Sequence, residues 1–289
     1  MATPLQIKKR IKSLKEEYDR LRVGRDSLSK LIDETEIVES VYNSNAIENS
    51  TLSLKETEKI LLEMEVSRNI SVREVFEAKN LAKVLEYVQT KLQEMNQETV
   101  LLLHRMLIGN INENIAGRFR KKDEYVRIGT YIAPPPEHIK RLIKNVLIEY
   151  SADHISFFLD KIAKFHLDFE TIHPFMDGNG RIGRVLINYH LYSLGFPGII
   201  IRDKDKKVYY SAFDLYRDDK NTKIMEKILA LALTESLHKR IAYLKGAEIL
   251  EVSEYAIKSG RSLQTLLNAA KRQTIPAFRE KGVWKVGIK

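Results

Sequence analysis

Apolar residues recur at intervals of three and four over most of the chain, which is the pattern of amphipathic helices. The clearest case runs from about residue 153 to 169, with apolar or ring side chains at Ile155, Phe158, Leu159, Ile162, Phe165, His166 and Phe169. After a glycine-rich segment, a second helix continues through Val185, Leu186, Tyr189 and Leu191, and we expect it to end at Gly195 and Pro197. Most of the candidate catalytic and binding residues lie in the segment between these two helices and at the start of the second.

Further helices are predicted on both sides of this pair. Residues 1 to about 30 are rich in Lys, Glu, Arg and Leu, which indicates a solvated helix packed along one stripe. The sequence Ser53-Leu54-Lys55-Glu56 is a capping box that opens another helix. The other predicted helices cover residues 31–49, 72–89, 100–108 and 224–241, and one begins at Tyr209-Tyr210. The predicted fold class is therefore all-α, apart from one short hairpin and a small C-terminal unit.

Residues 109 to 136 break the helical pattern. Glycine and asparagine recur between Gly109 and Asn114, and the residues from Tyr125 to Gly129 alternate in polarity as a strand does. Three prolines, Pro134 to Pro136, close the segment. We therefore predict a short β-hairpin in this region.

Composition bounds the class of protein. With 289 residues, of which 44% are hydrophobic, the chain can form one large domain and one small one. It has no apolar run near the 18 residues or so of a membrane span and no apolar N-terminal segment, so we expect a soluble protein that is not secreted by that route. Because there is no cysteine, disulfides and thiolate metal sites are excluded, which suits the reducing cytoplasm where we expect the protein to act. The net charge of +9 suggests an anionic partner.

The segment from His173 to Arg184 holds the parts that a nucleotide site needs. A Gly-Asn-Gly loop that enters a helix leaves backbone N–H groups free, and these suit phosphate. Arg181 and Arg184 lie one turn apart at the start of that helix, where cations are unfavourable unless an anion lies beside them. Asp177 can hold Mg²⁺ against phosphate oxygens, and His173 can act as a general base near neutral pH.

This segment resembles the motif of the Fic family, His-x-Phe-x-(Asp/Glu)-Gly-Asn-Gly-Arg-x-x-Arg, at every position. The resemblance implies transfer of the AMP moiety of ATP to a Ser, Thr or Tyr hydroxyl of a protein, with release of pyrophosphate. The resemblance implies that His173 is the base and that Asp177 is the ligand of Mg²⁺. It implies that the anion hole is formed by Gly178, Asn179 and Gly180, and that Arg181 and Arg184 bind the β- and γ-phosphates, respectively. Phe175 would be a buried anchor of the loop. The branch of the family that transfers a γ-phosphate carries Lys in place of Gly180, so glycine favours nucleotidyl transfer.

A second motif precedes this core. Ser44-x-x-x-Glu48-Asn49, within a predicted helix over residues 31–49, resembles the inhibitory helix of the same family, (Ser/Thr)-x-x-x-Glu-(Gly/Asn). The resemblance implies that Glu48 makes a bidentate pair with Arg184 and so occupies the guanidinium that the γ-phosphate needs. The resting enzyme would then be inhibited by its own helix.

The predicted hairpin resembles the family's flap, through Gly117, Arg120, Val126, Ile128 and the proline run. The flap, at about residues 117–136, would hold a segment of the target protein by strand addition. Since main-chain pairing demands no particular sequence, the target stays unidentified, and self-modification is expected as well.

The last forty residues form a separate predicted unit. Helices over residues 252–258 and 262–272, joined by Ser259-Gly260-Arg261, precede a strand, turn and strand over residues 275–286. This order resembles small excisionase-like winged helix modules. From residue 250 on there are eight Lys and Arg against three Glu, which suits a phosphate backbone. The module either binds DNA or packs on the core and binds protein. In the DNA-binding interpretation, bases are contacted by Gln264, Thr265 and Asn268, and phosphates by Lys271, Arg272 and Lys285.

The predicted organisation has three parts. Residues 1–99 form an N-terminal helical region, residues 100–245 the catalytic core, and residues 246–289 the winged helix-turn-helix unit. The predicted function is an autoinhibited, Mg²⁺- and ATP-dependent protein adenylyltransferase. Two alternatives stay open: an enzyme of the same family that uses another nucleotide or removes AMP, and a transcription regulator that binds DNA through its C-terminal unit.

Overall fold

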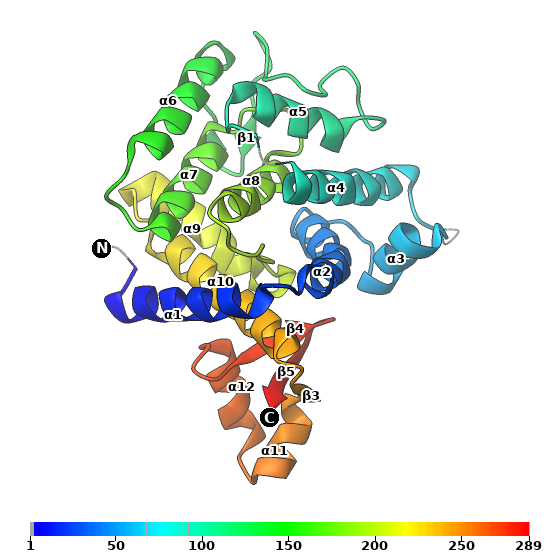
Figure 1. The fold of residues 1–289 in the computed structure, drawn as a ribbon. Helices are drawn as coiled ribbons and strands as arrows, with labels where there is room; N and C mark the ends of the chain where they lie inside the picture. The colour runs from blue at the N-terminus through cyan, green and yellow to red at the C-terminus, as the bar shows by residue number, and fades with distance from the viewer. Residues whose placement is uncertain (1–2, 67–68, 92, 289) are drawn as a thin grey trace.

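The computed structural model describes residues 3–66, 69–91 and 93–288. Helices account for most of these residues, as the apolar periodicity predicts (Figure 1). The helices are α1 (Leu5–Arg22), α2 (Asp26–Ile47), α3 (Leu54–Glu58), α4 (Val72–Thr90), α5 (Gln97–Ile108), α6 (Ile139–Ala152), α7 (Phe158–Ile172), α8 (Asn179–Ser193), α9 (Lys206–Asp219), α10 (Lys223–Leu244), α11 (Val252–Ser259) and α12 (Leu263–Lys271). The strands are β1 (Arg127–Ile128), β2 (Tyr131–Ile132), β3 (Glu248–Glu251), β4 (Ala277–Glu280) and β5 (Val283–Ile288).

Helices α7 and α8 pack against each other at the centre of the helical body (Figure 1). One hydrophobic cluster packs these helices against α4, α5 and α6, and it includes Phe169, Phe175 and Tyr189. A second cluster packs their other side against α1, α9 and α10, and it includes Leu191 and Tyr209. Full burial of one large apolar side chain contributes about 1.5–3 kcal/mol, and both clusters contain many such side chains. Helices α7 and α8 are therefore firmly packed on two sides, and the loop between them starts and ends in well-packed helices.

The predicted boundaries differ from the observed ones at several places. The helix predicted from residue 153 begins at Phe158, so the prediction is wrong for its first turn. The Asp153 carboxylate accepts the N–H groups of Ile155 and Ser156, and this local turn competes with helix formation. Ile155 is consequently 99% exposed. Helix α6 was not predicted at all, although its apolar side chains complete the first cluster.

The N-terminal region contains two long helices, as predicted, but the boundary between them lies earlier in the chain than residue 31. Helix α1 ends at Arg22, two residues before Gly24, whose φ of 71° lies in the left-handed region. Helix α2 then starts at Asp26, five residues before the predicted inhibitory helix, and ends at Ile47. The capping box at Ser53 is present as predicted.

The predicted hairpin is confirmed, although its strands are only two residues long. Strands β1 and β2 pair antiparallel, with Ile128 opposite Tyr131. The hairpin lies beside the C-terminal end of α7, since the Tyr131 hydroxyl donates to the carbonyl of Thr171.

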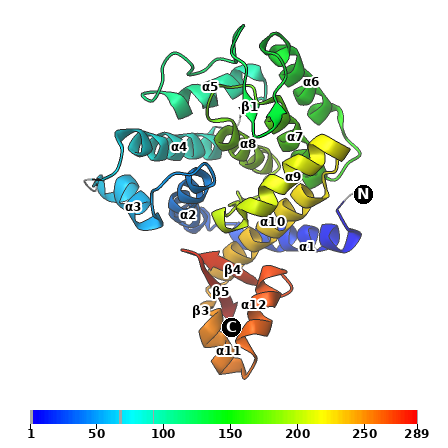
Figure 2. The same ribbon diagram turned by 180° about the vertical axis from the view of Figure 1, so that it is seen from behind.

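The C-terminal elements follow the predicted order of helix, turn, helix and two strands. Gly260, with φ 65°, joins α11 to α12, and β4 and β5 form an antiparallel pair to which β3 adds on the other edge of β5. This unit has its own small apolar cluster and projects from the end of α10, against which β4 and β5 pack (Figure 2). In the part of the chain that the structure describes, no helix has the length and apolar character needed to cross a membrane.

Candidate active site

His173 lies at the C-terminal end of α7 with an unusual backbone conformation. Its φ is 50°, in the left-handed region that helix C-termini usually reserve for glycine. Burial lowers the pKa of His173 to about 4, and the charges of Arg120 and Arg217 act in the same direction. The imidazole is therefore neutral at pH 7 and able to accept a proton.

The loop after His173 is held by hydrogen bonds between its own residues and by the burial of Phe175. The Asn179 side chain accepts the N–H of Phe175 (2.9 Å) and donates to its carbonyl (2.8 Å), which closes the loop on itself. Phe175 is fully buried and stacks on His104 with ring centroids 3.7 Å apart. His104 also accepts the N–H of Gly117 and donates to the carbonyl of Asp177, so its role is to pack and orient the loop. Gly178, with φ 81°, turns the chain into α8.

A polar cavity of about 220 Å³ lies over this loop. Its walls are Asn45, Glu48, Arg73, Glu77, His173, Met176, Asp177, Gly178, Asn179, Gly180 and Arg181. The structure therefore brings the predicted base, the predicted metal ligand and the glycine-rich loop to one cavity, together with Glu48 from 125 residues earlier in the chain than His173.

Glu48 reaches across the glycine-rich loop to Arg184. The Arg184 guanidinium, only 7% exposed, donates through Nη2 to Glu48 Oε1 at 2.9 Å. It also donates to the Ser44 carbonyl (2.8 Å) and, through Nε, to the Ser44 hydroxyl (2.9 Å). The predicted ion pair is thus present, but the prediction of a bidentate contact is wrong, because Ser44 takes the other bonds. The Glu48 carboxylate lies so close to Gly180 that a Cβ there would overlap its Oε1.

Arg181 is also held by carboxylates of the protein. Its guanidinium lies 3.0 Å from Asp177 and 3.2 Å from Glu77 of α4. Asp177 is contacted in addition by Arg73 of α4, at 2.5 Å. The anions that a pair of arginines at a helix N-terminus requires are therefore supplied by the protein itself.

Arg73 and Glu77 were not identified from the sequence. They are four residues apart on a helix and bond to each other at 3.0 Å, which is the pattern of an ordinary surface pair. Their position over the loop depends on how α4 packs against α8, and no local signal reports that.

The residues at the cavity fit a magnesium ion that is bound together with a nucleotide. Among the described residues there is no group of three or more His, Cys, Asp or Glu that could hold a metal ion alone. Mg²⁺ usually takes only one or two carboxylates and completes its shell with substrate phosphates and water. The Asp177 carboxylate, one-third exposed on the cavity, meets that requirement once Arg73 withdraws from it.

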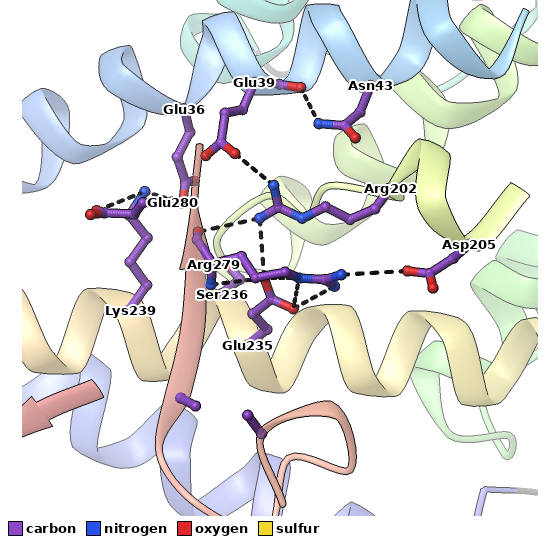
Figure 3. Close-up of polar contacts among 12 residues, drawn as sticks. Glu36, Glu39, Asn43, Arg202, Asp205, Glu235, Ser236, Lys239, Arg279 and Glu280 are labelled. Carbon is purple, nitrogen blue, oxygen red and sulfur yellow. Dashed lines mark hydrogen bonds and ion pairs between the residues drawn. The ribbon is translucent and has the colours of Figure 1, made fainter. Parts of the chain in front are cut away.

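Buried ion pairs fasten α2, the helix that ends next to Glu48, to the rest of the chain (Figure 3). Glu39 of α2 pairs with Arg202 at 2.7 Å, and Arg202 pairs in turn with Glu235 of α10 at 3.1 Å. Arg279 of β4 contacts the same Glu235 at 2.8 Å. Nearby, Lys239 of α10 joins Glu36 of α2 to Glu280 of β4. Breaking a buried pair of this kind is costly, so the helix is held in a defined position.

In the C-terminal unit, the predicted DNA-contacting residues have different surroundings. Gln264, Thr265, Asn268, Lys271 and Arg272 of α12 or its end are exposed. Lys285, in contrast, donates to Glu280 at 2.9 Å, so its charge is already compensated.

Comparisons with known proteins find a family match in the central part of the chain. Residues 94–191 match the model of the Fic/DOC family. The chain is 30% identical over 210 residues to protein adenylyltransferase fic-1 of Caenorhabditis elegans, which covers 70% of this chain and 40% of that protein. It is 31% identical over 176 residues to protein adenylyltransferase Fic of Nematostella vectensis, covering 59% and 41%. The chain thus spans about two-fifths of the length of these relatives.

Solved structures share the fold. A Fic domain containing signaling protein from Bacteroides thetaiotaomicron is 25% identical, with a TM-score of 0.74 over 82% of this chain and 97% of that one. A Fic family protein from Desulfovibrio desulfuricans, 20% identical, has a TM-score of 0.64 over 96% of this chain and 95% of that one. The second similarity concerns the fold alone, and it extends over almost the whole chain.

Proposed function

We propose that this chain, whose residues 94–191 belong to the Fic/DOC family, is a protein adenylyltransferase that restrains its own activity. The observation that carries the proposal is the convergence of a neutral His173 and the Gly178–Gly180 loop on one polar cavity. The names of the curated relatives support the same reaction.

In the proposed reaction, ATP lies in the cavity with its phosphates over the N-terminus of α8. His173 accepts the proton of a Ser, Thr or Tyr hydroxyl, and the oxygen forms a bond to the α-phosphorus as the bond to pyrophosphate breaks. The backbone N–H groups of residues 178–180 stabilise the charge on the phosphate oxygens. The proton then leaves His173 for solvent.

The two arginines of α8 bind the outer phosphates in this proposal. Arg181 takes the β-phosphate and Arg184 the γ-phosphate, each in exchange for a carboxylate that holds it in the resting state. Asp177 would hold Mg²⁺, which neutralises phosphate charge and orients the chain of phosphates. Phe175 supports the loop from the core.

The resting state is inhibited because Glu48 occupies Arg184. A γ-phosphate and the Glu48 carboxylate compete for the same guanidinium, and ATP that cannot reach Arg184 binds with its α-phosphate out of line with His173. Ser44 strengthens this state through its two bonds to Arg184.

The target is a protein segment that adds to the short hairpin beside His173, and the chain itself is one substrate. Main-chain pairing at β1 or β2 would place a hydroxyl near the base without a sequence requirement. The hairpin therefore does not specify which protein is modified, and an experiment is needed to identify the target.

The experiment is mass spectrometry of the purified chain and of its Glu48→Gly variant after incubation with Mg²⁺ and labelled ATP, CTP, GTP or UTP. We expect an added AMP from ATP, more in the variant, and none in a Glu48→Gly/His173→Ala chain that still binds ATP in calorimetry. Turnover in the His173→Ala chain would refute the role of the base. Loss of AMP from a previously modified chain would instead favour the removal reaction.

A second function is proposed for the C-terminal unit, namely DNA binding. It is favoured by the exposed polar face of α12, with Lys271 and Arg272 at its end. In the full chain, Lys271→Ala and Arg272→Ala should each weaken binding to duplex DNA and reduce its salt dependence by about one counterion. An absence of salt-dependent binding in the unaltered chain would favour a protein partner. A regulator without catalysis would be favoured if His173→Ala preserved every phenotype that these changes abolish.

A further inference from the structure

Arg120 is a buried cation between the hairpin and the candidate active site. Its side chain is only 3% exposed, and no carboxylate among the described residues lies within ion-pair distance of its guanidinium. It donates instead to four backbone carbonyls: Glu124 (2.9 Å), Pro134 (2.8 Å), Ile172 (3.3 Å) and His173 (2.9 Å). A guanidinium that is used wholly for backbone contacts fixes the positions of the segments that it joins.

These four acceptors belong to two segments of the chain. The carbonyls of Ile172 and His173 are at the C-terminal end of α7, where unpaired carbonyls and the helix dipole favour a cation. The carbonyls of Glu124 and Pro134 flank the β1–β2 hairpin. The Arg120 N–H adds a fifth contact, to the carbonyl of Pro174 at 2.9 Å. One residue therefore ties the hairpin to the backbone on both sides of His173.

His173 needs such support. A non-glycine residue in the left-handed region costs on the order of 1–3 kcal/mol and persists only where its surroundings enforce it. The imidazole Nδ1 is buried, and its polar contacts are with Glu170, one turn earlier on α7: a backbone contact that raises the pKa of the ring, and a carboxylate oxygen 3.9 Å away. Because these contacts run to the last turn of α7, the direction of the ring depends on the backbone that Arg120 holds.

We propose that Arg120 is the positioning residue of the catalytic histidine, and that it couples the hairpin, where a target strand docks, to the orientation of His173. This inference rests on the proposed adenylyl transfer. Arg120 is not among the residues that line the cavity, and it acts through the carbonyls of Ile172 and His173.

Arg120 also contributes charge. The groups that face His173 are Arg120, Arg217 of α9, Glu48 at the end of α2 and Glu170 of α7. Burial, opposed by the contact to Glu170, lowers the pKa of His173, and the positive charge of Arg120 lowers it further. Lysine in place of Arg120 keeps that charge but cannot make the four hydrogen bonds of the planar guanidinium. Methionine removes both.

The experiment compares Arg120→Lys and Arg120→Met in the Glu48→Gly chain, with Arg118→Lys as the matched control. Arg118 is two residues away and pairs with Glu124, but it makes no contact with the α7 terminus. We expect both Arg120 variants to lower kcat for self-modification by on the order of 10²-fold with little change in KM for ATP, since a misplaced catalytic group costs about that factor. In the methionine variant alone, the acid limb of the pH–rate profile should move to higher pH. Arg118→Lys should stay within about twofold.

A second measurement separates this inference from the proposed function. Histidine NMR titration of the chain without nucleotide should give a raised pKa for His173 in Arg120→Met and a value near that of the unaltered protein in Arg120→Lys. If no chain incorporates AMP, the proposed function fails, and an unmoved His173 resonance and pKa in Arg120→Met would overturn the positioning role on its own.

The test remains decisive if the variants do not fold. A crystal structure of the unaltered chain with a non-hydrolysable ATP analogue and Mg²⁺ should keep Arg120 on the carbonyls of Ile172 and His173. A complex in which His173 keeps its place while Arg120 has left those carbonyls would overturn the inference, as would Arg120 variants with undiminished kcat.

Discussion

The contact between Glu48 and Arg184 can be tested by shortening one side chain. Glu48→Gly removes the carboxylate that lies over Gly180 and leaves Arg184 with its bonds to Ser44. Since Glu48 is the C-cap residue of α2 and does not lie inside the helix, glycine at this position costs less than the roughly 1 kcal/mol that it costs in a helix interior. The substitution therefore reports the effect of the Glu48 carboxylate on the rate and not an effect on the stability of α2.

The magnitude follows from the exposure of the two partners. Arg184 is 7% exposed and Glu48 36% exposed, so the pair lies between a surface pair, worth about 0–1 kcal/mol, and a buried one, worth about 3–5 kcal/mol when broken. A contact worth about 1–2 kcal/mol that competes with a phosphate should change the rate of transfer by roughly 5- to 30-fold. We expect AMP incorporation to rise by that factor in Glu48→Gly.

The assay is the initial rate of AMP incorporation from labelled ATP as a function of ATP concentration. Glu48→Gln, which keeps the shape of the side chain, should fall between the parent and Glu48→Gly, because an amide still bonds to Arg184 but carries no charge. Glu34→Gln, an exposed change on the same helix, should have no effect. Equal rates in the parent and Glu48→Gly over the full range of ATP would refute the inhibitory role.

Further predictions concern the groups around this contact. Arg73→Met should free Asp177 and increase the affinity for Mn²⁺ in the presence of ATP several-fold, as measured by electron paramagnetic resonance, and unchanged affinity would contradict the exchange of Arg73 for a metal. The low pKa of His173 keeps the ring neutral well below pH 6, and loss of the Glu48 charge lowers that pKa further, so the rate in Glu48→Gly should fall only at about pH 4 or below; a midpoint near 6.5 would mean that the ring is not buried. Arg202→Met leaves the Glu39 carboxylate buried and unpaired; it should lower stability to urea by about 3–5 kcal/mol and, by loosening α2, raise self-modification. Arg202→Met/Glu39→Gln should recover part of that stability, and equal loss in both chains would exclude the pair as the cause.

Much of the candidate site was predictable because its parts are contiguous. His173, Asp177 and the glycine-rich loop lie within a few residues of each other at the junction of two helices, so local geometry alone places them around the same helix N-terminus. The apolar periodicity predicted α7 and α8 for the same reason, since a buried face repeats every three to four residues wherever a helix packs. Glu48 was predicted from a motif, and the ion pair that it makes with Arg184 is present.

Other features depend on contacts between residues far apart in the chain, which no local pattern encodes. Arg73 and Glu77 form an ordinary helical pair until α4 packs against α8 and brings them to Asp177 and Arg181. The role of Arg120 arises only when the hairpin loop meets the end of α7, some fifty residues further along. Local turns can also oppose periodicity, as at Asp153, where side-chain hydrogen bonds hold off the start of a helix.

The sequence by itself thus determined the helical class and predicted the candidate base and the candidate phosphate loop, because these follow from residues that are neighbours along the chain. Only the tertiary structure decided which carboxylates contact the two arginines of the loop and which side chain bonds to the carbonyl of His173. The physical reason is that an ion pair or a buried hydrogen bond is selected by distance in space, and packing of the helices sets that distance.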